Sequence, residues 1–160
     1  MSTVLQTMSK ALRIGCGVHL LHSQLYELSE THGESMLPTL NYAGDYVHVN
    51  KYYRRGRGVG VGDLIIAVKP TDPHQYVCKR ITGMEGDYVL VDPSAGDFER
   101  YIQVPKGHCW VTGDNLSASL DSRTYGVMPL GLIKGKIFAI WGWSDGRFEW
   151  VSNHFPTNKS

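Results

Sequence analysis

The chain has 160 residues and a formal net charge of +1 at pH 7, with 42% hydrophobic and 19% charged residues. This composition excludes wholesale disorder, and the balance of charge excludes a global basic field that would attract nucleic acid. The three cysteines, Cys16, Cys78 and Cys109, form no Cys-x-x-Cys pair, so neither a disulfide framework nor a zinc site is indicated. We expect no metal and no cofactor.

Residues 1–30 form the first predicted unit, an N-terminal helix that targets the chain or anchors it at a membrane. Residues 1–26 contain Lys10 and Arg13 but no acid. Their uncharged part, 14–26, is about 20 Å long as a helix, against roughly 30 Å of hydrocarbon in a bilayer. At helical spacing, one stripe is formed by Leu5, Met8, Leu12, Cys16 and Leu20. The pattern indicates a mitochondrial targeting or interfacial helix, and the alternative is a helix packed on the chain's own core.

From residue 40 onward the pattern is that of β-strands, frequently interrupted by Gly, Pro and Asp. In segment 45–50, Val47 and Val49 alternate with polar and aromatic residues, as in a strand with one buried face. Further strands are predicted at 64–68, 76–81, 88–91, 101–104, 109–112 and 136–141. We therefore expect a mainly β domain over residues 31–150, a bent antiparallel sheet or barrel, followed by a C-terminal tail at 151–160.

A serine and a lysine stand out as candidate catalytic groups. Ser35 follows a glycine and precedes a proline-stiffened apolar segment, which suits an exposed hydroxyl held in a loop. Alternation in 76–81 places Lys79 on the face of Val77 and Ile81, where an unpaired ammonium is costly and loss of its proton is the usual escape. The alternative is a lysine whose ammonium reaches water.

The polar loop 113–126 is the third candidate element. Asp121 and Arg123 are two residues apart and can pair as a structural clasp, while the serines around them can orient a neutral amine. A plain polar loop remains the alternative.

Four motifs resemble, in their order, those of the type I signal peptidase family. They are Ser-Met-x-Pro-Thr at 35–39, Gly-Asp-x-Val at 44–47, Lys-Arg-x-x-Gly-x-x-Gly-Asp at 79–87, and Gly-Asp-Asn…Ser-x-Asp-Ser-Arg-x-x-Gly at 113–126. The resemblance spans about residues 30 to 142. The short chain and the Lys-Pro-Thr-Asp-Pro segment at 69–73 look most like the fungal mitochondrial inner-membrane members of that family.

The resemblance implies a role for each matched residue. Ser35 corresponds to the nucleophile, Lys79 to the general base and Ser119 to the hydroxyl that positions the lysine, with Asp121 and Arg123 as the supporting pair. It also implies a bent all-β catalytic core with an N-terminal helical tether. Many bacterial relatives carry a hydroxyl residue where this chain has Gly33, so the oxyanion hole is expected to rest on backbone N–H groups such as that of Ser35.

By the same resemblance, the chain is expected to be a serine endopeptidase of the mitochondrial inner membrane, with its catalytic domain facing the intermembrane space. Its expected substrates are the sorting presequences of precursor proteins, and a second, related catalytic subunit is the expected partner. Membrane lipid is a further expected partner, through Trp141 and Trp143. The pocket walls that we expect from the sequence are Met36, Leu37, Val47 and Val49.

Three alternatives remain open. One is a self-cleaving Ser/Lys regulator of the same fold. Another is a non-catalytic β-barrel that binds nucleic acid through the basic and aromatic loop 51–57. The third is a Ser-His-Asp hydrolase that uses His32, His48 or His108.

Overall fold

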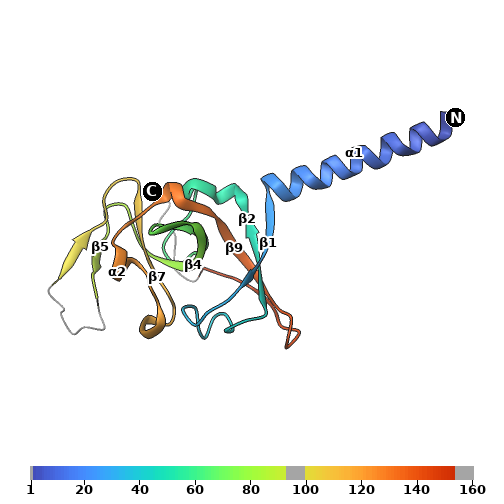
Figure 1. Cartoon of the computed structure of the whole chain (residues 1–160). Helices are drawn as coiled ribbons and strands as arrows, with labels where there is room; N and C mark the ends of the chain where they lie inside the picture. Colours follow the sequence, from blue (N-terminus) through green and yellow to red (C-terminus); the bar gives the residue numbers. More distant parts are fainter. Residues whose placement is uncertain (1, 93–99, 154–160) are drawn as a thin grey trace.

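A long helix and a curled antiparallel sheet make up the computed structural model, which describes residues 2–92 and 100–153 (Figure 1). The elements in chain order are α1 (Ser2–Gln24), β1 (Tyr26–Thr31), β2 (Asp45–Asn50), η1 (Lys51–Gly56), β3 (Leu64–Lys69), β4 (Asp72–Met84), β5 (Tyr88–Leu90), β6 (Tyr101–Gln103), β7 (His108–Thr112), η3 (Leu116–Ala118), α2 (Ser122–Tyr125), β8 (Met128–Pro129), η4 (Leu130–Leu132), β9 (Ile133–Gly142) and β10 (Phe148–Trp150).

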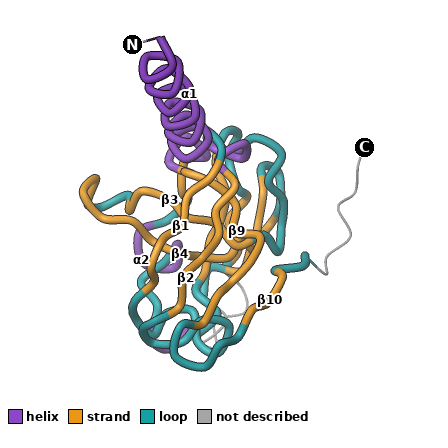
Figure 2. The backbone as a smooth tube through the Cα atoms, turned by 90° about the vertical axis from the view of Figure 1, so that its right-hand side faces the viewer, coloured by secondary structure: helices purple, strands orange, loops and turns teal. Residues whose placement is uncertain are grey.

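The main sheet has eight strands in the order β1-β2-β9-β3-β4-β7-β8, with β10 paired to β9. All of its pairings are antiparallel, and β5 and β6 form a separate two-stranded sheet. Figure 2 shows the strands curling around one another beneath the helix. The predicted fold class, a bent mainly β domain with one N-terminal helix, is confirmed.

Strand β3 lies at the centre of the core because both of its faces are buried. Leu64 and Ile66 pack in one apolar cluster with Met36 and Leu40. Ile65 and Ala67 pack in a second cluster on the other face, together with residues of β4, β7 and β9. A strand covered on both faces is typically an uninterrupted apolar run, which is what 64–68 shows in the sequence.

Among the unpaired strand edges in the part of the chain that the structure describes, two belong to β1 and β4. β1 is an end strand of the sheet and pairs only with β2. β4 pairs with β3 along its first part but with β7 only from Arg80 onward, so Asp72–Lys79 has an unpaired edge. Such edges are templates for the addition of another strand.

The boundary of the N-terminal unit differs from the prediction. The helix ends at Gln24, and Tyr26–Thr31 is strand β1 of the main sheet rather than helix. An edge strand with polar residues at alternate positions carries little apolar signal, so its pairing with β2 is not visible in the sequence.

Helix α1 projects away from the sheet (Figure 1), and its side chains are exposed on all sides. The exposed fractions of Met8, Leu12 and Leu20 are 64%, 69% and 60%, so the apolar stripe does not pack on the domain's own core. Among the described residues, no helix combines the length and the apolar character that a membrane crossing requires.

The predicted tail at 151–160 begins as part of the domain. Val151 packs against the core, and the Asn153 side chain donates hydrogen bonds to Val61 O and to Asp63 Oδ1. Residues 154–160 lie outside the described part of the chain.

Candidate active site

Ser35 lies in a loop after β1 that is fixed at both ends. Gly33 has a φ of +109°, a conformation that favours glycine, and its N–H donates a hydrogen bond of 2.7 Å to Tyr42 O. On the other side of Ser35, Met36 and Leu40 are 3% and 2% exposed and anchor the loop in the core. The serine is thus held between a tight turn and a buried apolar anchor.

Lys79 approaches this loop from β4. The residue is 4% exposed, in agreement with the face that strand alternation assigns to it. Its Nζ lies 2.7 Å from Ser35 Oγ and donates a 3.0 Å hydrogen bond to Cys78 O. Within the described residues, Lys79 forms no ion pair with a carboxylate.

Burial without a paired carboxylate sets the protonation of this amine. Desolvation lowers the pKa of Lys79, and the nearby charges of Asp121 and Asp114 oppose that shift without cancelling it. A neutral Nζ has a lone pair that can accept the proton of the Ser35 hydroxyl at the observed distance. The pair therefore has the geometry of a nucleophile and its general base.

Cys78 is the neighbouring thiol and does not compete as a nucleophile. It lines the same pocket as Ser35, but burial raises the pKa of its thiol to about 12. At neutral pH it is therefore a thiol, whereas the thiolate is the reactive form.

A pocket of about 120 Å³ opens beside Ser35 and Lys79. The residues around it come from the end of β1, the Ser35 loop and β4: Thr31, His32, Gly33, Ser35, Met36, Leu40, Asn41, Tyr76, Val77, Cys78 and Lys79. Two of the predicted pocket walls are wrong. Val47 and Val49 face the correct side of β2, but they are 0% and 1% exposed and lie in the core cluster beneath the pocket.

Of the remaining two predicted walls, Met36 lines the pocket and Leu37 does not. Strand alternation predicts which face of a strand points inward. It does not predict whether other side chains cover that face and keep it from lining a pocket. The apolar surface beside Ser35 comes instead from Leu40 and Val77, which the sequence did not single out.

Asp121 and Arg123 form the predicted clasp in loop 113–126. The Arg123 Nε and Asp121 Oδ1 are 2.9 Å apart, and the Gly113 N–H donates a 3.0 Å hydrogen bond to Asp121 Oδ2. Arg123 Nη2 also donates to the carbonyl oxygens of Leu116 and Ser119. Burial raises the pKa of Asp121, but the hydrogen bonds from Arg123 and Gly113 outweigh it and leave this pKa below its usual range.

Ser119 lies in loop 113–126, close to the backbone of Ser35. A Cβ at Gly113 would overlap both Ser119 Oγ and Ser35 O, so both serines pack closely against this glycine. Ser119 Oγ is buried, and its hydroxyl helps to lower the pKa of the neighbouring Asp121 carboxyl. The structure therefore brings Ser119 next to the nucleophile's backbone but shows no bond from it to Lys79.

A second ion pair at this site was not predicted from the sequence. The Arg80 guanidinium donates two hydrogen bonds to the Asp114 carboxylate, at 2.8 and 2.6 Å, and the Thr39 hydroxyl donates a third. Asn115, next in the chain, donates from its backbone N–H to Ser35 O at 3.0 Å. Side-chain hydrogen bonds thus join the motifs at 35–39, 79–87 and 113–126. The sequence indicated this only by the polar residues that the three motifs contain.

The Ser35 N–H is available as an oxyanion donor. Among the described residues it donates no hydrogen bond, although the Ser35 carbonyl is held by Asn115. The backbone direction at Ser35 is therefore fixed, while its amide is unbonded among the described residues.

The histidines considered as alternative bases are not bonded to the serine. The Tyr26 hydroxyl contacts His48 Nδ1 on the outer face of β2, and His108 Nδ1 contacts Lys106 O. His32 lines the pocket, but its ion-pair contact is to Glu30.

Comparison with known proteins agrees with this geometry. The model of the family described as "Signal peptidase, peptidase S26" matches residues 5–97 and 92–143. The chain belongs to the signal peptidase family. The recognition that rested on four ordered motifs is confirmed.

Relatives cover nearly the full chain. Mitochondrial inner membrane protease subunit 1 of Saccharomyces cerevisiae is 51% identical, with 94% of this chain and 90% of the relative aligned. The proteins of the same name from Schizosaccharomyces pombe and Homo sapiens are 44% and 40% identical, over 89% and 86% of this chain and 88% and 82% of their own. As a member of this family, the chain is a protease of the signal peptidase type.

Proposed function

We propose that this chain is a serine endopeptidase of the mitochondrial inner membrane, with Ser35 as nucleophile and neutral Lys79 as general base. The observation that carries the proposal is the 2.7 Å contact between Ser35 Oγ and the Nζ of a lysine that is 4% exposed. The membrane assignment rests on the names of the relatives.

The chemistry follows from the two atoms in contact. Ser35 Oγ attacks the scissile carbonyl as its proton passes to Lys79 Nζ, and the resulting ammonium then protonates the leaving amine. Water, deprotonated by the same amine, hydrolyses the acyl-enzyme and frees Ser35. The Ser35 N–H stabilises the oxyanion, a contribution of about 3 kcal/mol for one well-placed donor.

Three neighbours keep this geometry. Ser119, which lies beside Gly113 and the Ser35 carbonyl, orients the lone pair of Lys79. The Asp121–Arg123 clasp holds the loop that carries Ser119, because it bonds both the backbone of that loop and its start at Gly113. These three are positioning residues rather than catalytic residues.

The substrate is an extended segment of a precursor presequence. The free edges of β1 and of the first part of β4 both border the pocket, through Thr31 on one side and Val77 on the other. A strand added to either edge gains main-chain hydrogen bonds and directs alternate side chains into the pocket. Met36, Leu40 and Val77 form the apolar wall of that pocket.

The catalytic domain faces the intermembrane space and acts with a related second subunit. One relative, from Danio rerio, is named subunit 2 of the protease and is 33% identical over 85% of this chain and 74% of its own length. Membrane lipid is a further partner. Trp143 is 68% exposed and its ring stacks edge-on with Trp141 at 5.2 Å, which is an amphipathic pair suited to the lipid interface.

The test is cleavage of a presequence peptide by the full chain. Loss of cleavage in both Ser35→Ala and Lys79→Ala, with the fold retained by circular dichroism, supports the proposal. A Lys79→Ala variant that keeps full activity while His32→Ala loses it would instead indicate a histidine base.

A further inference from the structure

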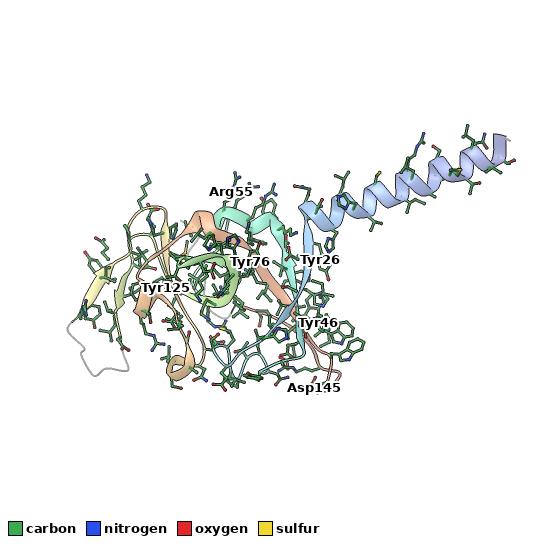
Figure 3. All side chains as sticks on the ribbon, viewed as in Figure 1. Tyr26, Tyr46, Arg55, Tyr76, Tyr125 and Asp145 are labelled. Atoms are coloured by element: carbon green, nitrogen blue, oxygen red, sulfur yellow. The ribbon has the colours of Figure 1, made fainter. Side chains whose placement is uncertain are left out.

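A second pocket, of about 480 Å³, lies where α1 joins the sheet and is not used by the proposed chemistry. Five basic residues line it: Lys51, Arg54, Arg55, Arg57 and Lys134. Most of them belong to the loop 51–57 that the sequence marks as basic and aromatic. Figure 3 labels Arg55 at the edge of the domain that α1 leaves, with Tyr76 below it.

The pocket carries an uncompensated positive charge. Its one carboxylate, Glu27, is paired with Lys51 at 2.7 Å. Within residues 2–92 and 100–153, none of Arg54, Arg55, Arg57 and Lys134 pairs with a carboxylate. A concave site with several unpaired cations favours a bound anion, and guanidinium groups match the oxygens of a phosphate.

The backbone holds the central arginine in an unusual conformation. Arg55 has a φ of +60°, and it is the one non-glycine residue with a positive φ in the described part of the chain. A left-handed conformation at a residue other than glycine is uncommon and directs the side chain away from the path of its neighbours. Arg57 and Lys134 are held at the pocket by rings, 5.7 Å from the Tyr52 ring centre and 5.8 Å from that of Tyr76.

The surroundings of the pocket indicate where the anion comes from. Ser23 at the end of α1 lines the pocket, and Lys51 Nζ donates to His22 O and Ser23 O, so the pocket includes the end of the helix. The apolar residues of α1 are exposed, which is the arrangement of a helix that lies against lipid. Tyr52 and Tyr76 at the rim are 58% and 64% exposed, and exposed tyrosines are typical of the headgroup level.

We propose that this pocket binds the phosphate group of an anionic phospholipid and so fixes the domain at the membrane surface beside α1. The inference rests on the membrane location in the proposed function but not on its chemistry. Tyr76 lines both this pocket and the one beside Ser35, so a lipid seated here would also set how the substrate groove meets the bilayer.

An acidic side chain of a substrate is the competing occupant. The observations favour the lipid, because the cations lie at the end of α1, whose apolar residues are exposed, rather than at the dyad. The two occupants give different results in the test.

The test measures binding of the full chain to vesicles of phosphatidylcholine alone and of phosphatidylcholine with phosphatidylglycerol, at physiological ionic strength. The double variant Arg55→Gln/Lys134→Gln should lower the partition onto phosphatidylglycerol vesicles about thirty-fold relative to the unmodified chain. The matched control, Arg100→Gln/Lys106→Gln, removes two charges beside β6, which pairs with β5 at the end of the domain opposite α1 (Figure 1). It should change the partition less than about threefold.

Each other outcome would overturn the proposal. An unchanged partition in the pocket variant, or an equal fall in the control, would show that no specific site is present. Release from the vesicles by inorganic phosphate at the concentration of the lipid would assign the site to free phosphate.

Cleavage of a soluble peptide without lipid separates this inference from the proposed function. The pocket variant Arg55→Gln/Lys134→Gln should cleave this soluble peptide as well as the unmodified chain does. If the unmodified chain cleaves a peptide with an acidic residue faster than its alanine counterpart, and the pocket variant loses this preference while its vesicle binding is unchanged, the pocket would be assigned to the substrate. Absence of cleavage by the unmodified chain would instead refute the peptidase chemistry and leave the lipid site to be judged on vesicle binding.

Discussion

Lys79 and Arg123 are two cations of the candidate site that are largely shielded from solvent, and their surroundings give them opposite behaviour. Lys79 forms no ion pair with a carboxylate of the described residues, and burial lowers its pKa. Arg123 contacts the fully buried Asp121, whose hydrogen bonds raise the pKa of that guanidinium further. A cation buried without a partner tends to lose its proton and can serve as a base, whereas one buried with a carboxylate keeps its charge and supports structure.

The largest expected effect comes from removing the base. Lys79→Ala should lower peptide cleavage at least about 10⁴-fold, because the Ser35 hydroxyl then has no proton acceptor at 2.7 Å. Ser35→Ala should lose a similar factor, and the double variant should lose little more, since the two groups act as one unit. Single-turnover experiments measure the cleavage rate of each single variant and of the double variant. Losses that multiply in the double variant would contradict the dyad.

Breaking the clasp should cost stability. Asp121→Ala leaves Arg123 and the Gly113 N–H without their buried acceptor and should lower the free energy of unfolding by about 3–5 kcal/mol. The control is Glu149→Ala, which breaks an exposed ion pair of 3.8 Å and should cost under about 1 kcal/mol. Urea unfolding compares the two. Equal losses would mean that the clasp is no stronger than a surface pair.

Removing the positioning hydroxyl should have a smaller effect. Ser119→Ala should reduce kcat about tenfold and raise the apparent pKa of the acid limb of the pH profile, if Ser119 donates to the neutral amine during catalysis as proposed. The control is Ser117→Ala, in the same loop, because the Ser117 hydroxyl donates to Asn115 Oδ1. A fall in kcat with no change in the pH profile would make Ser119 a packing residue.

The smallest effect is on the pH dependence of stability. The pKa of Lys79 is lowered in the folded state, so the unfolded chain binds more protons between that lowered pKa and the ordinary value of about 10.4. The unmodified protein should therefore gain stability relative to Lys79→Met as the pH rises through this window. Chemical unfolding at several pH values checks it, and a stability difference independent of pH would mean that the lysine remains charged.

Much of the fold follows from local pattern. Alternation at 45–50 and the apolar run at 64–68 predict β2 and β3, and the same alternation places Lys79 on a buried face. The strands β1, β8 and β10 were not predicted, because they are short or polar and are stabilised by pairing with distant partners.

The candidate site is predictable in part. The motifs name Ser35 and Lys79, but the Arg80–Asp114–Thr39 network joins strand β4 to two loops that are far apart in sequence. Val47 and Val49 were misassigned for a related reason, since burial depends on side chains that pack over a strand from elsewhere in the chain.

The most direct test of the account is an NMR titration of the lysine side chains in ¹³C-labelled protein, with Lys79→Met to assign the signal. The account predicts that one lysine, absent from the variant, titrates well below the ordinary value of about 10.4. Titration of that lysine at the ordinary value, alongside all the others, would contradict the claim that Ser35 faces a neutral amine.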